Sequence, residues 1–278
     1  MDMIDVFNTG ETQESLRREY NPDGSVLRRA QLRMLEMLDY LVEVADRIGV
    51  DWRLDGGNVL GAMRHGGFIP WDDDVDIIVK QKDYKRFCDY LKANPHPRFV
   101  LQDNTTDAGY LKSWASLRDL KSEHVSTEEE GSRDRRALEN MKYRGLHVDI
   151  FPYEDRILPS LQRIAGKLSV FVNIDLAPKH PVLGKLGYEL LENCVFPLFR
   201  LCGHLFGKRG EFMNSYGTWF YNRVPVEFLE PYKPIEFEGK FYNGPADPER
   251  YCRKIYGSYL DLPPKDKRNQ HKATVRFL

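Results

Sequence analysis

The chain has 278 residues, of which 41% are hydrophobic and 30% charged, as in an ordinary globular protein with one large or two small domains. The formal net charge of −1 excludes a bulk electrostatic attraction to nucleic acid or to an anionic membrane, so no nucleic-acid partner is predicted. The four cysteines have no Cys-x-x-Cys spacing, which indicates reduced thiols and neither a zinc site nor a disulfide framework.

The first residues are acidic and lack the apolar segment of a signal peptide or a membrane anchor, so the default prediction is a cytoplasmic location. Further along, apolar residues recur at helical spacing from Leu27 to Ile48, with charged residues between them. This pattern predicts a long amphipathic helix that packs on the core.

The most informative stretch runs from Leu54 to Val79. It opens with a predicted strand (52–54), a turn that contains Gly56 and Gly57, and a short predicted helix (59–64). Glycines at such a junction let a phosphate approach the backbone N–H groups at the positive end of a helix dipole. Taken alone, the pair is more often a plain turn. The stretch fits neither the dinucleotide-binding fingerprint nor the P-loop.

Acidic residues close the same stretch, where Asp72, Asp74 and Asp76 lead into the β-branched segment 77–79. Side chains alternate along a strand, so Asp74 and Asp76 are expected to share a face, where two carboxylates can bracket a divalent cation. Acidic runs are usually solvated loops. Here, however, the acids enter a core strand, where carboxylates repel one another without a cation. An EF-hand is excluded, because isoleucine stands where its loop needs glycine.

Downstream, periodicity predicts an amphipathic helix over residues 82–91. Strands are predicted over residues 98–102 and 111–117, and they complete a small mixed sheet. The charged segment 128–136 is predicted to be a solvated loop, with a substrate lid as the alternative.

A further strand is predicted at residues 146–152, where alternation places His147, Asp149 and Phe151 on one face. An aspartate in an otherwise apolar strand needs a cation or a hydrogen-bond partner. Taken alone, the pattern favours a structural, hydrogen-bonded Asp149, and it leaves His147 open between substrate contact and structure.

From Leu158 to about Phe212 the chain is helical in tendency and rich in leucine, phenylalanine and glycine. Charged residues interrupt every stretch that approaches the ~20 residues needed to span a bilayer. A helical subdomain is the simplest interpretation. Peripheral contact with a membrane that carries a lipid-linked acceptor is the alternative.

The C-terminal part contains basic residues after a Pro-Pro turn, namely Lys267, Arg268 and His271. An arginine in this position can bind a phosphate bidentately. Lone basic residues normally face solvent, so the pattern by itself leaves their role open.

The run from Leu54 to Ile77 reads LDGGNVLGAMRHGGFIPWDDDVDI. Its order of glycines and acids resembles the DNA polymerase β-like nucleotidyltransferase superfamily. The whole run is similar to the LicD family, which includes bacterial phosphocholine transferases and is related to fukutin-related protein. The similarity continues in the helix before Trp52, in residues 146–152 and in residues 251–271, and it leaves out roughly residues 158–226.

The resemblance implies an α/β (α+β) fold: a polymerase β-like nucleotidyltransferase core with a small mixed sheet, flanking helices and a helical insertion. The catalytic core is expected over residues 27–157 and the helical insertion over residues 158–226. A C-terminal region, residues 227–278, is expected to complete the active site.

The resemblance also implies a site for Mg²⁺ or Mn²⁺. Asp74 and Asp76 are the central predicted ligands, and Asp72 and Asp149 complete the shell. Asp149 matches the third carboxylate that polymerase β-like enzymes supply from a neighbouring strand, and it is the candidate base for the acceptor hydroxyl. The residues expected to bind the donor are Gly56, Gly57, Arg64, His65, Lys267, Arg268 and His271.

By resemblance, the protein is a LicD-like phosphotransferase. It is expected to move phosphocholine or a polyol phosphate from a CDP-alcohol, such as CDP-choline, to a hydroxyl of a glycan, lipid-linked glycan, lipopolysaccharide or teichoic-acid precursor, with release of CMP. The expected place is the cytoplasm, at the inner face of the membrane. Two alternatives stay open: nucleotidyl transfer from a nucleoside triphosphate to a small molecule, and a catalytically idle metal-binding interaction module. The sequence identifies neither the alcohol, nor the acceptor, nor the oligomeric state.

Overall fold

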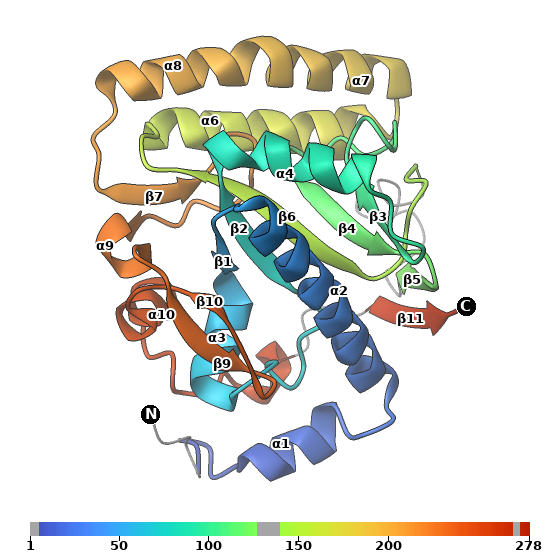
Figure 1. Cartoon of the computed structure of the whole chain (residues 1–278), viewed down its shortest axis with the longest axis vertical. Coiled ribbons are helices and arrows are strands. Elements are labelled where there is room, and N and C mark those ends of the chain that lie inside the picture. Colours follow the sequence, from blue (N-terminus) through green and yellow to red (C-terminus); the bar gives the residue numbers. More distant parts are fainter. Residues whose placement is uncertain (1–5, 127–139, 269–272) are drawn as a thin grey trace.

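A mixed β-sheet lies at the centre of the computed structural model, which describes residues 6–126, 140–268 and 273–278 (Figure 1). In hydrogen-bonded order its strands are β1 (Trp52–Leu54), β2 (Asp76–Lys80), β6 (His147–Glu154), β4 (Ala115–Asp119) and β3 (Phe99–Gln102). β2 and β6 are parallel, and the other neighbours in this order are antiparallel. The sheet continues from β6 into β7 (Glu211–Asn214) and β8 (Val224–Pro225).

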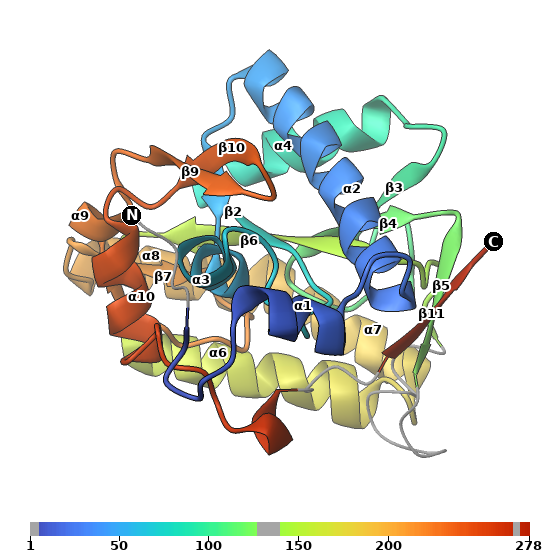
Figure 2. The same ribbon diagram turned by 90° about the horizontal axis from the view of Figure 1, so that it is seen from below.

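Helices cover both faces of this sheet, as Figure 2 shows. α2 (Val26–Ile48) and α4 (Gln81–Ala93) pack on one face, and α6 (Pro159–Val170) lies on the other. A strand between two layers needs apolar residues on both sides. The continuous buried run Ile77–Val79 in β2 meets that need.

Local sequence signals explain the length of α2. The helix begins after Ser25, whose hydroxyl accepts a hydrogen bond from the N–H of Arg28, and it ends at Gly49, which adopts the left-handed conformation. Between these caps, Met34, Leu38 and other apolar side chains at helical spacing are fully buried. The helix predicted over 27–48 is thereby confirmed.

The region predicted to be helical forms an outer layer with its own small core. After α6 the chain continues through η1 (Phe171–Leu176), α7 (Pro181–Leu190), η2 (Leu191–Val195) and α8 (Phe196–Phe206). Buried residues such as Ala165, Val172 and Phe196 join these helices to one another. The domain boundaries expected at residues 157 and 226 stay predictions.

Smaller elements complete the described fold. They are α1 (Gln13–Tyr20), α3 (Gly56–His65), α9 (Val226–Leu229), the hairpin β9 (Lys233–Phe237) and β10 (Lys240–Gly244), α10 (Pro248–Tyr256), the 3₁₀ turn η3 (Lys265–Lys267), and the pair β5 (Ser122–Ser126) with β11 (Ala273–Phe277). The hairpin and the β5–β11 pair were not predicted. The predicted loop at 128–136 lies outside the described residues.

Other predicted elements are confirmed with shifted ends. α4 and β3 stand where the helix over 82–91 and the strand over 98–102 were predicted. β4 begins only at Ala115, because the preceding chain contacts the helical layer instead, where the Tyr188 hydroxyl donates to the carbonyl oxygen of Lys112 (3.4 Å). None of the described helices is long and apolar enough to cross a membrane.

Candidate active site

The parallel pairing of β2 and β6 brings two predicted acids together. Asp76 lies directly opposite Asp149 in the register of the two strands, and the Asp149 N–H donates to the carbonyl oxygen of Val75 (2.9 Å). Side chains at paired positions of neighbouring strands point to the same face of a sheet. The two carboxylates therefore share one face.

Asp149 is buried and held by hydrogen bonds. Trp114 donates its indole N–H to Oδ2 (3.0 Å), and the Ser116 hydroxyl donates to Oδ1. Burial raises the pKa of Asp149, but the charges of His147 and Lys112 act in the opposite direction, and the net shift lowers the pKa below its ordinary value. Asp149 is therefore ionised at neutral pH and held in position by its hydrogen bonds. The Nε2 atom of His147 lies 3.9 Å from its Oδ1 atom.

The pKa values of two other acids are shifted in the opposite direction to that of Asp149. Burial raises the pKa of Asp76 well above its ordinary value, and the charges of Asp74 and Asp149 raise it further. The pKa of Asp72 is raised in the same way by burial and then by Asp74. Negative charge is therefore crowded at the start of β2, and a cation placed there would relieve the repulsion.

Asn58, in the first turn of α3, holds this acidic segment in place. Its side-chain oxygen accepts from the N–H of Asp76 (2.7 Å), and its amide nitrogen donates to the carbonyl oxygen of Asp74 (3.3 Å). The residue is 2% exposed. Asn58 was not predicted as a site residue, although an amide side chain directly after two glycines was the available signal.

The two glycines are the first residues of α3, which starts three residues earlier than predicted because Asp55 is its N-cap. Gly56 has φ +53°, which favours glycine. A Cβ atom on Gly57 would lie 3.0 Å from Asp72 Oδ2, and one on Gly56 would lie 3.8 Å from Asp76 Oδ2. The acids thus lie close to the helix N-terminus, and the space beside Gly57 is the narrower of the two.

Tyr251 of α10 completes this corner and was missed from the sequence. The Gly56 N–H donates to its hydroxyl oxygen (3.0 Å), and the hydroxyl donates to Asp55 Oδ1. Tyr251 is fully buried, so α10 fixes the glycine turn from the C-terminal side. No local signal marks this contact, because the two segments are distant in the chain.

Two cavities adjoin the acids. One of about 160 Å³ lies at the N-terminus of α3, and its lining includes Gly56, Gly57, Asp76 and Phe151. A larger one of about 470 Å³ lies beside Asp72, and its lining includes Arg64, Trp71, Asp72, Tyr259 and Lys267. Tyr256 lines both, so a ligand with two parts can occupy neighbouring spaces.

Arg64 and His65 have structural partners. The Arg64 guanidinium donates to the carbonyl oxygens of Tyr259 and Asp261 (both 3.1 Å) and to Nε2 of His65 (2.9 Å). The other ring nitrogen of His65 is 2.8 Å from Gln13 Oε1. Burial and then the Arg64 charge lower the pKa of His65 to about 2, so the ring is neutral. A role of either residue in donor binding stays a prediction.

Arg268 is likewise occupied. Its guanidinium forms two hydrogen bonds with the Glu11 carboxylate (2.8 and 2.7 Å), donates to the carbonyl oxygen of Pro263 (2.8 Å), and lies over the ring of Trp71. The phosphate-binding role of Arg268 stays a prediction. In this structure the Glu11 carboxylate neutralises the Arg268 guanidinium. Lys267 lines the larger cavity, and His271 lies outside the described residues.

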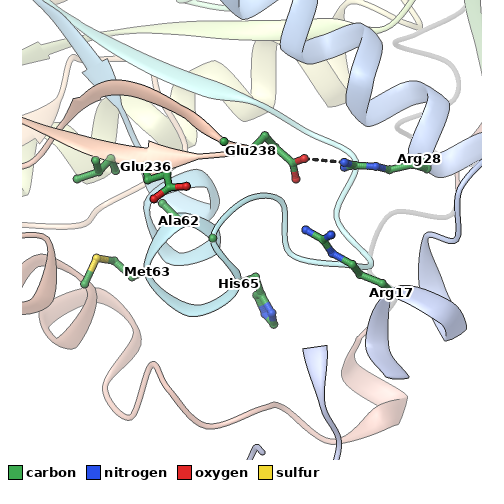
Figure 3. A pocket seen from close by; sticks show the side chains of 10 residues that line it. Arg17, Arg28, Ala62, Met63, His65, Glu236 and Glu238 are labelled. Atoms are coloured by element: carbon green, nitrogen blue, oxygen red, sulfur yellow. Dashed lines mark hydrogen bonds and ion pairs between the residues drawn. The ribbon is translucent and has the colours of Figure 1, made fainter. Parts of the chain in front are cut away.

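A third cavity, of about 560 Å³, lies at the opposite, C-terminal end of α3 (Figure 3). Its lining includes Arg17, Arg28, His65 and Glu238, and Arg28 donates to the Glu238 carboxylate (2.6 Å). Glu238 also accepts from the N–H of Phe68 (3.0 Å). The acid thereby ties the β9–β10 turn to α2 and to the loop after α3.

The predicted metal ligands supply only oxygen atoms, which are the donors that Mg²⁺ and Mn²⁺ prefer. Within the described residues, no three His, Cys, Asp or Glu side chains are close enough to hold a metal ion as they stand. Two observations nevertheless fit a hard cation: the crowding that raises the pKa of Asp72 and Asp76, and the glycine-lined space that both acids face.

The fold and the site define a class of protein. Residues 49–160, which contain the glycines and all the acids of the site, match the LicD/FKTN/FKRP nucleotidyltransferase domain. The chain therefore contains a LicD/FKTN/FKRP nucleotidyltransferase domain and is a LicD-like phosphotransferase.

Similarity to individual proteins extends beyond this domain. The lipopolysaccharide cholinephosphotransferase LicD of Haemophilus influenzae is 26% identical over 271 residues, which cover 91% of this chain and 98% of that protein. This similarity therefore includes part of the region 158–226, where no resemblance was expected from the sequence motifs.

Two shorter matches differ in extent. The ribitol 5-phosphate transferase FKRP of Homo sapiens is 44% identical over 58 residues, 21% of this chain and only 12% of that protein. A Rickettsia typhi protein, RT0683, is 32% identical over 60 residues, 22% of this chain and 19% of that protein.

Proposed function

We propose that this phosphotransferase moves a phospho-alcohol unit, such as phosphocholine or a polyol phosphate, from a CDP-alcohol to a hydroxyl of a glycan or cell-surface polymer precursor, and releases CMP. Two relatives, a lipopolysaccharide cholinephosphotransferase and a ribitol 5-phosphate transferase, support this reaction. The observation that carries the proposal is the Asp76–Asp149 pair on parallel strands beside the glycine N-terminus of α3. The same arrangement supports a polymerase β-like core.

Mg²⁺ or Mn²⁺ is proposed to be held by Asp72, Asp74 and Asp76, with Asp149 on the neighbouring strand. Such an ion neutralises a diphosphate and stabilises the CMP leaving group. The free N–H groups at the N-terminus of α3, at Gly57, would bind a phosphate oxygen. The cavity between Trp71 and Tyr259 would take the remainder of the donor, because aromatic faces suit a planar base.

Asp149 is proposed to accept the proton of the attacking hydroxyl. Its lowered pKa keeps it ionised at neutral pH, and Trp114 and Ser116 fix its position. A base must lie within hydrogen-bond reach of the proton that it takes, and a rigid carboxylate beside Asp76 can meet this requirement. The cytoplasmic location stays a prediction.

Substrate assays with radiolabelled CDP-choline, other CDP-alcohols, CTP and ATP test the reaction. Release of CMP from a CDP-alcohol is the expected result, and it should need both Mg²⁺ or Mn²⁺ and a hydroxyl acceptor. Pyrophosphate release from CTP or ATP would instead establish nucleotidyl transfer. Binding of CDP-alcohols without turnover of any substrate, across a panel of glycan acceptors, would favour the idle metal-binding module.

Metal and nucleotide should also bind cooperatively, because only the cation and the diphosphate together balance the crowded acids. The dissociation constant of CDP, measured by calorimetry with Mg²⁺ and again with EDTA, should rise on chelation. An unchanged constant would argue against a metal at these residues.

A further inference from the structure

The outermost helix of the molecule exposes a row of large apolar side chains. α7, η2 and α8 form one continuous rod from Pro181 to Phe206, because the residues that join them stay helical. The rod is about 39 Å long. We call its exposed apolar residues the leucine face: Val182, Leu183, Leu186, Leu190, Leu198, Leu201, Leu205 and Phe206.

The inner side of the rod explains why the leucines point outward. A Cβ atom on Gly184 would lie 2.4 Å from Ala177 Cβ, and one on Gly203 would lie 2.3 Å from the carbonyl oxygen of Arg156. Arg200 forms an ion pair with Glu154 on the same inner side (3.1 Å). The rod therefore packs inward through these glycines, the polar pair and a few buried apolar residues such as Leu191 and Phe196, so most of its leucines remain on the outer side.

Basic residues predominate around the leucine face. Between residues 179 and 209, all of which the structure describes, the acids are Glu192, which is half-buried, and Glu189, whose side chain is 46% exposed and forms an ion pair with Lys185 (3.9 Å). The exposed basic residues are Lys179, His180, Lys185, His204, Lys208 and Arg209. Basic residues thus stand at both ends of the apolar row, with Lys179 before α7 and Lys208 and Arg209 after α8.

We propose that the leucine face docks on the surface of a lipid bilayer that contains anionic lipids. Helices with an apolar face and flanking cations lie in the plane of the membrane interface, with the apolar side chains in the headgroup and acyl boundary and the cations at lipid phosphates. Because none of the described helices can span a bilayer, the contact is peripheral. This binding is independent of the proposed transfer reaction.

The charge pattern favours a bilayer over a second copy of the chain. A two-fold contact through this face would place the same patch on both sides, so the cations at the ends of one rod would meet those of the other. Like charges in contact repel, and Glu189, the more exposed of the two acids in the segment, is already paired with Lys185. An anionic lipid surface supplies the opposite charge along the whole length.

Vesicle co-sedimentation with the full chain tests the proposal. The protein should bind vesicles of phosphatidylcholine with phosphatidylglycerol, bind phosphatidylcholine alone more weakly, and dissociate as the salt concentration rises. Leu190→Glu and Leu201→Glu should each weaken binding at least about tenfold. The Lys208→Gln/Arg209→Gln double variant should weaken it roughly 30-fold at low salt.

A matched control places the same new charge on an apolar residue elsewhere. Phe241, in β10, is 73% exposed, and Phe241→Glu should bind vesicles like the parent. Unchanged melting temperatures would show that the leucine variants remain folded.

Parental binding by Leu190→Glu and Leu201→Glu would overturn the proposal, and so would failure of the parent protein to bind either kind of vesicle. A dimer in solution that Leu190→Glu converts to a monomer, without any vesicle binding, would assign the face to a second copy instead. Release of CMP from a CDP-alcohol, measured with a water-soluble acceptor, is a separate readout, so failure to bind vesicles is distinguishable from failure of the proposed function.

Discussion

The sheet and the outer helical rod depart from the usual burial pattern in opposite ways. In the sheet, Asp76 and Asp149 carry carboxylates into the interior, whereas in α7 and α8 leucines such as Leu190 stand in solvent. The buried acid has compensating partners within the chain, because Trp114 and Ser116 donate to Asp149. The leucines have no comparable cover among the described residues. Asp149 is thus stabilised from inside the fold, whereas the exposed leucines are the basis of the proposed contact with a bilayer.

Removing one buried charge should have the largest effect. Asp76→Asn keeps the shape of the side chain and removes a proposed metal ligand, so turnover should fall by orders of magnitude. The metal-free variant should stay folded and be more stable than the parent at neutral pH. The pKa of Asp76 is raised in the folded protein, so the ionised carboxylate destabilises the fold at any pH above the pKa of Asp76 in the unfolded chain. Activity assays and melting curves with EDTA measure both effects. Asp23→Asn, at an exposed position, is the control and should change neither. Turnover within a few-fold of the parent would refute the metal assignment.

A leucine-to-alanine substitution should change the free energy of unfolding much more in the core than in the leucine face. Leu38→Ala, at a side chain in α2 that is 0% exposed, should lower the free energy of unfolding by about 2–5 kcal/mol. Leu190→Ala, at a side chain that is 58% exposed, should change it by no more than about 0.5 kcal/mol. Urea denaturation of both variants tests this. A large loss in Leu190→Ala would show that the leucine face already packs on part of the chain.

A carboxylate with an arginine partner should show the opposite pH dependence to Asp76. The hydrogen bonds from Arg268 lower the pKa of Glu11 to about 2. A lowered pKa contributes stability above the unfolded value, and that stability is lost as the pH falls from about 4.5 to about 2. Glu11→Gln should therefore lower the free energy of unfolding by about 1.5–3 kcal/mol at pH 7. The difference from the parent should shrink in acid. A difference that stays constant from pH 7 to pH 2 would contradict this account.

Gly57→Ala should produce the smallest effect, which should appear in the kinetics with the donor and not in the stability of the fold. The added methyl group would lie 3.0 Å from Asp72 Oδ2, in the space where a phosphate oxygen would approach the N–H, so the KM for the donor should rise several-fold and turnover should fall. Thermal stability should change little, because Gly57 has no positive φ and alanine suits a helix. Steady-state kinetics beside a melting curve decide the matter. Lower stability with parental kinetics would indicate a plain turn.

Much of the fold and part of the site follow from local sequence. The 3.6-residue periodicity of α2 depends on neighbours a few positions away, so its span was predicted to within one residue. The glycines, the acids of β2 and the strand that holds Asp149 were also found, since each belongs to a short continuous motif. The first residues of helices were predicted less well. α3 begins at Gly56 because of its backbone dihedral angles, which a periodic pattern of apolar residues does not indicate.

Which distant residues meet depends on the three-dimensional packing of the chain. The parallel register that sets Asp76 opposite Asp149, the β5–β11 pair, and the Arg268–Glu11 ion pair join segments far apart in the chain, and their formation depends on the closure of long loops and on three-dimensional packing. The same holds for the leucine face. Periodicity shows that α7 and α8 have apolar residues, but the close approaches at Gly184 and Gly203 show which side of each helix faces the protein, because a side chain cannot fit there.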